Sequence, residues 1–123
     1  MKMKYEPIKR LSEGEVEAAI LRNDPQELPS AIISAALHSD DPDWAEDVCL
    51  RMSEHEHSNV RGNAIFGFAH IARNHGKLDQ KKVKPVIEAA FNDENNFVRV
   101  QADDAADELE WLLKWKINRP ANH

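Results

Sequence analysis

Apolar residues recur three and four positions apart along most of the chain, which is the spacing that lines one face of an α-helix. Short polar stretches separate the periodic segments. No stretch alternates apolar and polar residues with the β-branched enrichment of a strand. The pattern predicts an all-α protein with six helices, at residues 12–23, 25–38, 42–54, 58–75, 79–92 and 96–116.

Helix start signals support several of these boundaries. Ser12 is followed three residues later by Glu15, which is the spacing of a capping box. Asp24 and Asp41 each precede a proline, a pattern typical of a helix cap followed by proline in the first turn. The loops are only a few residues long, so consecutive helices should be antiparallel neighbours.

We expect one domain over residues 1–123, with flexible ends at 1–11 and 117–123. Its core should consist of the apolar residues that share one face of each helix, because such residues are mostly buried. The predicted core residues are Trp44, Val48, Leu50, Met52, Val60, Ala64, Ile65, Phe68, Ile71, Ala72, Val83, Val86, Ile87, Ala90, Phe91, Val98, Ala102, Ala105, Leu109, Leu112 and Leu113.

The pattern Val-Arg-x-x-Ala occurs twice in the chain. It begins at Val60 and again at Val98, 38 positions later, and each copy follows a polar turn and opens a long helix. The valine and alanine fall on one helix face, where the small alanine lets another helix approach closely. The arginine beside them can reach carboxylates or carbonyl groups of the neighbouring repeat.

This repeat resembles the HEAT family, in which the second helix of a pair often begins with an acidic turn and then Val-Arg-x-x-Ala. The resemblance covers residues 42–114, whereas the pair at 12–38 has Leu28-Pro29 where the motif has Val-Arg. It implies a short right-handed α-solenoid of about three antiparallel helix pairs with an atypical first repeat and a concave binding surface. The departure in the first pair leaves a plain helical bundle open.

Composition and charge narrow the classes of function. The chain is 41% hydrophobic and 31% charged, and its 22 acidic residues against 16 basic ones give a formal charge of −6. A net acidic surface argues against generic binding to nucleic acid phosphates or anionic membranes. A single cysteine, Cys49, and no signal peptide or membrane-spanning run indicate a cytoplasmic location.

Candidate catalytic chemistry is sparse. His55-Glu56-His57 could bind a transition metal, as paired His-Glu dipeptides do in some HEAT-type enzymes, but the further ligands of such a site are not recognisable. Cys49 lies beside two acids, which favour the neutral thiol. We therefore predict no catalytic residue, metal or cofactor, and keep a metal-dependent HEAT-type enzyme using His55, Glu56 and His57 as an alternative.

Four lysines, at positions 77, 81, 82 and 84, gather near the start of the fifth predicted helix. Some HEAT-like proteins bind nucleic acid through such surfaces. Without interleaved aromatic residues the signal is weak. A nucleic-acid-binding module using Lys77 to Lys84 is therefore a second alternative, and nucleic acid is not the expected partner.

Two acidic clusters carry the main functional hypothesis. Between positions 101 and 110 all charged residues are acidic, although like charges four residues apart destabilise a helix. Asp103, Asp107 and Glu110 share one stripe of the predicted helix, and the adjacent stripe carries Asp104, Glu108, Trp111 and Trp115. Arginines from neighbouring repeats and the helix dipole could offset that repulsion, or a basic protein partner could do so. A tryptophan beside the acids could anchor such a partner. The predicted partner-binding residues are Asp103, Asp107, Glu110 and Trp111, followed by Asp43, Glu46 and Asp47.

The sequence thus predicts a non-catalytic protein-binding module that acts by occlusion or scaffolding through an acidic concave face. Small acidic helical immunity proteins, which neutralise basic nuclease toxins in bacteria, share its size and charge, so an inhibitor or immunity-type protein is the expected function. Trp111 and Trp115 could equally form a homodimer contact, which leaves a monomer and a homodimer both open.

Overall fold

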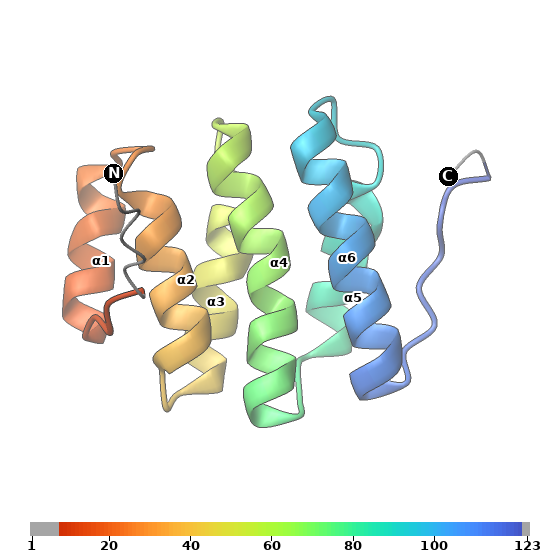
Figure 1. Cartoon of the computed structure of the whole chain (residues 1–123), viewed down its shortest axis with the longest axis horizontal. Helices are drawn as coiled ribbons and strands as arrows, with labels where there is room; N and C mark the ends of the chain where they lie inside the picture. Colours follow the sequence, from red (N-terminus) through yellow and green to blue (C-terminus); the bar gives the residue numbers. More distant parts are fainter. Residues whose placement is uncertain (1–7, 122–123) are drawn as a thin grey trace, which may run out of the picture.

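The computed structural model describes residues 8–121, and within that range the chain forms six helices and no strand. Figure 1 shows their order along the molecule. The helices are α1 (Glu13–Arg22), α2 (Leu28–His38), α3 (Pro42–Met52), α4 (Ser58–His75), α5 (Gln80–Ala90) and α6 (Asn96–Leu113).

The helices are arranged around α4. Helices α2, α4 and α6 lie side by side in one layer, α3 and α5 lie behind them, and α1 packs against α2 at one end (Figure 1). Helix α4 contacts α2, α3, α5 and α6. The all-α prediction is therefore confirmed for the described residues, and no helix among them is both long and apolar enough to cross a membrane.

Local signals explain where most helices begin and end. The Ser12–Glu15 capping box is present, and the Asp41 side chain accepts the Trp44 N–H at 3.1 Å. The prediction of a helix start at Asp24 is wrong, because Asp24 instead forms a turn with Gln26 and α2 begins at Leu28. Helix α6 ends earlier than predicted because Lys114 adopts a left-handed conformation with φ of 60°.

The predicted core is confirmed, although some of its residues at the periphery are only partly buried. The residues predicted on α4 and most of those on α3, α5 and α6 are buried, while Trp44, Leu50, Val86, Leu112 and Leu113 pack against the core partly exposed. The poorly matching first pair contributes as well. Its buried apolar residues include Val16, Leu28, Ile32, Ala35 and Ala36.

Two glycines let other elements approach α4 closely. A Cβ at Gly67 would lie 2.5 Å from the Cys49 Sγ of α3, and a Cβ at Gly62 would overlap the Phe97 ring of α6. The residue that Gly67 meets, Cys49, is fully buried and cannot shift easily. The residue that Gly62 meets, Phe97, is 37% exposed, so its ring can move towards solvent. Gly67 therefore fixes the spacing between α4 and α3.

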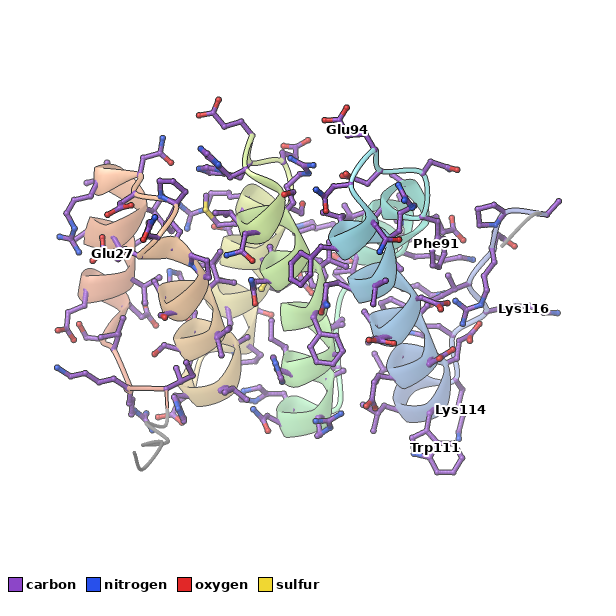
Figure 2. All side chains as sticks on the ribbon, turned by 45° about the horizontal axis from the view of Figure 1, so that its top comes forward. Glu27, Phe91, Glu94, Trp111, Lys114 and Lys116 are labelled. Atoms are coloured by element: carbon purple, nitrogen blue, oxygen red, sulfur yellow. The ribbon has the colours of Figure 1, made fainter. Side chains whose placement is uncertain are left out.

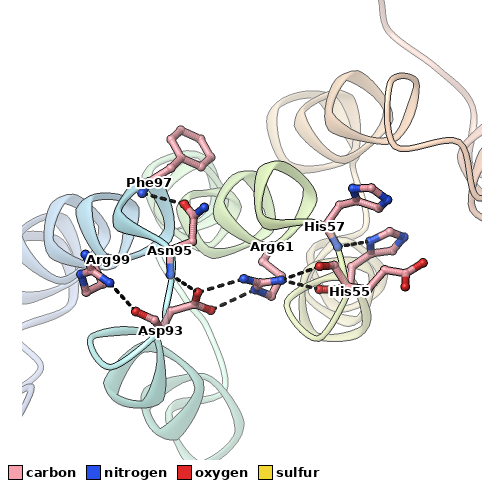
Figure 3. Close-up of polar contacts among 8 residues, drawn as sticks. His55, His57, Arg61, Asp93, Asn95, Phe97 and Arg99 are labelled. Carbon is pink, nitrogen blue, oxygen red and sulfur yellow. Dashed lines mark hydrogen bonds and ion pairs between the residues drawn. The ribbon is translucent and has the colours of Figure 1, made fainter.

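The two arginines of the repeated motif tie the turns together (Figure 3). Arg61 donates to both carboxylate oxygens of Asp93, each at 2.9 Å, and also to the carbonyl oxygens of His55 and Glu56. Arg99 donates to the Asp93 carbonyl oxygen at 2.6 Å. The predicted reach into the neighbouring repeat is confirmed for Arg61, which joins the turn before α4 to the turn before α6. Arg99 instead binds the turn that precedes its own helix.

This pair is largely shielded from solvent, with exposed side-chain fractions of 14% for Arg61 and 16% for Asp93. The hydrogen bonds from Arg61 lower the pKa of Asp93 below its ordinary value of 3.8, and Asp93 in turn raises the pKa of Arg61. A carboxyl group with a depressed pKa stabilises the fold above its unfolded pKa and loses that contribution as the pH falls.

The described parts of the chain ends make contacts, although we expected flexible ends. The Leu11 N–H donates to the Ser34 hydroxyl oxygen at 2.8 Å, and Ile117 is buried. Apolar burial and satisfied backbone groups hold such segments on a domain surface. The rest of both expected ends, residues 1–7 and 122–123, lies outside the described residues.

Gly67→Ala should lower the free energy of unfolding by about 1 to 2 kcal/mol, because overpacking against Cys49 outweighs the better helix propensity of alanine. Gly14→Ala is the matched control, since its Cβ would meet nothing nearer than the Ser12 hydroxyl at 3.9 Å. Urea unfolding measures both. Equal stabilisation by both substitutions would contradict the close contact.

Asp93→Asn should lower the free energy of unfolding at pH 7 by about 2 kcal/mol, because it removes a shielded charge-assisted pair. The difference from wild type should begin to shrink below about pH 4, where the carboxyl becomes protonated in the unfolded chain, and should vanish only below the depressed pKa of the folded state. Urea unfolding at pH 7 and pH 3 tests this. Glu94→Gln, in the same turn but exposed, is the control, and a pH-independent deficit would refute the pair's role.

Candidate functional site

Three of the predicted partner-binding acids meet one basic side chain of the same protein. Arg119 donates to the carboxylates of Asp103, Asp107 and Glu110 at 3.1, 2.8 and 2.7 Å. The three acids therefore share one helix stripe, as predicted from their spacing. The sequence did not predict their counterion, because Arg119 lies beyond the end of α6.

The segment that carries Arg119 turns back along α6 after Lys114 (Figure 1). Ile117 is buried, and the Asn118 N–H donates to the Glu88 carboxylate at 2.8 Å. The guanidinium carbon of Arg119 lies 5.5 Å from the centre of the Phe91 ring, within reach of a cation–π interaction. These contacts dock the segment against α5 and α6.

A hollow of about 490 Å³ opens between α4 and α6. It is lined by Phe66 of α4 and by Asp104, Asp107 and Glu108 of α6. The spacing of the three acids puts them on the half of α6 that faces away from the buried Ala105 and its neighbours. The hollow therefore presents an aromatic wall opposite carboxylates, which is a suitable environment for a cationic side chain.

His70 and Arg73 follow Phe66 along the same side of α4. The His70 ring meets the Phe66 ring edge-on, with their centres 5.0 Å apart, and Arg73 pairs with Glu108. Among the described residues, the buried Nδ1 of His70 has no hydrogen-bond partner. Burial, and secondarily the charge of Arg73, lower the pKa of His70 below 6.5, and the opposing effect of Glu108 is smaller.

Exposed apolar side chains flank the acids along α6. Trp111 is 73% exposed, and Val100 and Phe97 are 45% and 37% exposed. The Lys114 ammonium lies 4.9 Å from the centre of the Trp111 ring, at the end of α6 that carries both labels in Figure 2. We call the surface formed by Phe66, Phe97, Val100, Asp104, Asp107, Glu108 and Trp111 the α4–α6 face.

The second predicted acidic cluster lies elsewhere and is corrected in part. Glu46 is buried, and its carboxylate accepts the Asp79 N–H at 2.7 Å, so it supports the start of α5 and is not a surface acid. Asp47 pairs with Arg51 at 2.9 Å, and Asp43 is exposed. Their helix, α3, lies behind the layer that carries the α4–α6 face (Figure 1).

The lysine cluster meets this same second group of acids. Lys77 and Lys82 line a hollow of about 510 Å³ together with Asp43, Glu46 and Asp47. Carboxylates beside the ammonium groups oppose the approach of phosphates. The geometry therefore gives no support to the nucleic-acid alternative.

The histidine motif is held by hydrogen bonds. The His55 Nδ1 accepts the His57 N–H at 3.0 Å, so its Nε2 carries the proton and donates to the Asn23 side-chain oxygen at 2.6 Å. Both ring nitrogens of His55 are thus engaged. Among the described residues no group of three or more His, Cys, Asp or Glu side chains is placed to hold a metal ion.

Cys49 is fully buried between α3 and α4. Burial, with a smaller contribution from the Glu46 charge, raises the pKa of Cys49 to about 12. The thiol therefore stays protonated at neutral pH and is a packing residue, as the sequence predicted.

The chain was compared with known proteins. No protein family model matches the sequence, and no curated protein matches it. A similar solved structure is a chain in the crystal structure of the CDI complex from Cupriavidus taiwanensis LMG 19424. The TM-score is 0.78 at 23% identity, and the match covers 90% of this chain and 98% of that chain. At this identity the likeness shows a shared fold.

Sequence reasoning missed the partners that the fold brings to α6. It placed Asp104 and Glu108 on a stripe beside Trp111 but did not include them among the binding residues, and it did not assign Phe66 or His70 to any site. The available signal was Phe66 itself, an aromatic residue on the polar side of α4, because ordinary core residues would lie on the opposite side.

His70 should titrate below 6.5 in the folded protein, as measured by NMR of its ring protons. Because its folded pKa is depressed, protonation opposes folding, and the protein should lose stability as the pH falls from 7 towards the folded pKa. Arg73→Gln should raise the His70 pKa only in part, since burial remains. A His70 pKa at or above 6.5 in the wild type would contradict the burial seen here.

Proposed function

We propose that this chain is a non-catalytic binding protein of the immunity type, which neutralises a basic protein toxin by covering it with the α4–α6 face. A bacterial nuclease fits this description, because its surface must be basic to bind nucleic acid. We also propose that the two-layered arrangement is a short right-handed HEAT-like solenoid. Such a solenoid presents the second helices of its repeats as a binding surface.

The observation that carries the proposal is the chemistry of the α4–α6 face. It combines carboxylates with exposed aromatic and apolar side chains, which is the combination that gives an interface both orientation and anchoring. Asp104 is exposed and has no ion pair among the described residues, so its charge is available to a partner. Trp111, with most of its ring in solvent, supplies a candidate anchor.

The structural likeness supports the class of partner. The similar chain comes from a CDI complex, and CDI stands for contact-dependent inhibition, in which a toxin pairs with its immunity protein. Nearly the whole of that chain is matched. The acidic character of the present chain favours the immunity side of such a pair, with the toxin supplying the basic surface.

The structure changes which acids we assign to the interface. Of the residues proposed from the sequence, we retain Asp107 and Trp111 and add Asp104 and Phe66. Asp103 and Glu110 bind Arg119 and do not line the hollow, Glu46 is buried, and Asp43 and Asp47 lie on α3, away from this face. Asp107 also binds Arg119, but we retain it because it lines the hollow with Phe66. A charge reversal at Asp104 is therefore a cleaner probe than one at the acids bound by Arg119, because it breaks no ion pair within the described residues.

The proposal is tested by capture, reconstitution and rescue. A protein that remains bound in stoichiometric amount to the tagged chain from its native cells is expressed alone to test whether it arrests growth. Co-expression of the wild-type chain should restore growth. Asp104→Lys should weaken binding of the purified toxin at least about tenfold and abolish rescue, since like charges then meet in the interface.

Glu54→Lys is the matched control, because Glu54 is an exposed acid in the turn after α3, away from the α4–α6 face. It should bind and rescue as the wild type does, with unchanged thermal unfolding in all three proteins. The proposal fails if no captured protein arrests growth, or if Asp104→Lys rescues as well as Glu54→Lys.

A further inference from the structure

The C-terminal segment places a basic side chain of this protein on Asp107, one of the acids that its partner would use. Arg119 is 24% exposed, and two of its contacts, to Asp107 and Glu110, come from the same nitrogen, Nη2. That nitrogen has two N–H groups, so it can serve both carboxylates at once. Such surface pairs are individually weak and exchange readily with other cations.

Asp107 belongs to two environments at once. Its carboxylate lines the hollow opposite Phe66, and the same carboxylate accepts from Arg119. Its side chain is 71% exposed, so a second cation can reach it from solvent. A guanidinium entering the hollow therefore meets a carboxylate that is already engaged by the C-terminal segment.

We propose that residues 117–121 form an autoinhibitory clasp, in which Arg119 occupies the acidic stripe in place of an arginine or lysine of the basic partner. The partner gains Asp107 by displacing Arg119, and the segment then leaves α6. The inference relies on the proposed function for the basic nature of the partner. The apparent affinity for the partner then equals the intrinsic affinity multiplied by the fraction of molecules in which the clasp is open.

The contacts of the segment determine how strongly the closed state of the clasp is favoured over the open state. Burial of Ile117 and the hydrogen bond from Asn118 to Glu88 hold the segment in place, while the ion pairs of Arg119 are open to competition. The segment and the partner cation exclude one another because a single carboxylate, that of Asp107, serves both. A clasp of this kind discriminates against weak, non-specific polycations and yields to a partner that makes further contacts.

The test uses the whole 123-residue chain and a fluorescein-labelled octa-arginine peptide at physiological salt. Arg119→Ala should bind the peptide roughly three- to tenfold more tightly than the wild type, because the closed fraction is removed. Lys116→Ala is the matched control, since it removes the same charge from an exposed lysine that points away from the helices in Figure 2. It should gain clearly less affinity than Arg119→Ala.

A second pair of variants isolates Asp107. In the Arg119→Ala background, Asp107→Asn should cancel the gain, whereas Asp43→Asn, which removes an exposed acid from α3, should leave most of it. Equal affinities of Arg119→Ala and Lys116→Ala would overturn the clasp. So would a gain that survives Asp107→Asn.

Hydrogen exchange of the wild-type protein keeps the proposal testable if Arg119→Ala unfolds. Saturating octa-arginine should speed exchange of the Asn118 amide, whose hydrogen bond to Glu88 is lost when the segment leaves. Unchanged or slower exchange of that amide in the saturated complex would overturn the clasp. The outcome is independent of growth rescue, so failure of the clasp and failure of the proposed function are distinguishable.

Discussion

The ion pair between Arg61 and Asp93 is the interaction on which the arrangement of α4 and α6 depends. One guanidinium joins the carboxylate of one turn to the carbonyl groups of the other, and Arg99 secures the same turn from the opposite side. The two turns lead directly into the two longest helices. A fixed distance between the turns therefore fixes the relative position of the helices that follow them.

That constraint has a consequence at the surface. With the N-terminal ends held by Arg61, close packing at Gly62 brings the Phe97 ring onto α4. Further along, Phe66 faces the acids of α6 across a hollow that the main core does not fill. The same motif that specifies the repeat therefore also positions the α4–α6 face, so stability and the proposed binding surface share one structural cause.

Periodicity and cap residues were enough to predict the helices, most of the core and the common stripe of Asp103, Asp107 and Glu110. They work because each depends on neighbours within about one or two turns. The start of α2 was mispredicted because Asp24 satisfies a turn as readily as a cap. The burial of Glu46, the hollow at Phe66 and the position of Arg119 depend on contacts between residues nine or more positions apart, which local spacing does not encode.

The charges at the end of α6 bear on two separate properties, which are long-range attraction of a partner and short-range selectivity for it. Three carboxylates within one stripe would repel one another, and Arg119 relieves that repulsion without cancelling it, because one positive charge faces three negative ones. The stripe thus keeps a net negative charge, whose field would attract the proposed basic partner over roughly a Debye length of 8 Å. Under the proposed clasp, close contact would still require that partner to compete with Arg119 for Asp107. Long-range attraction and short-range selectivity can in this way be set by the same four side chains.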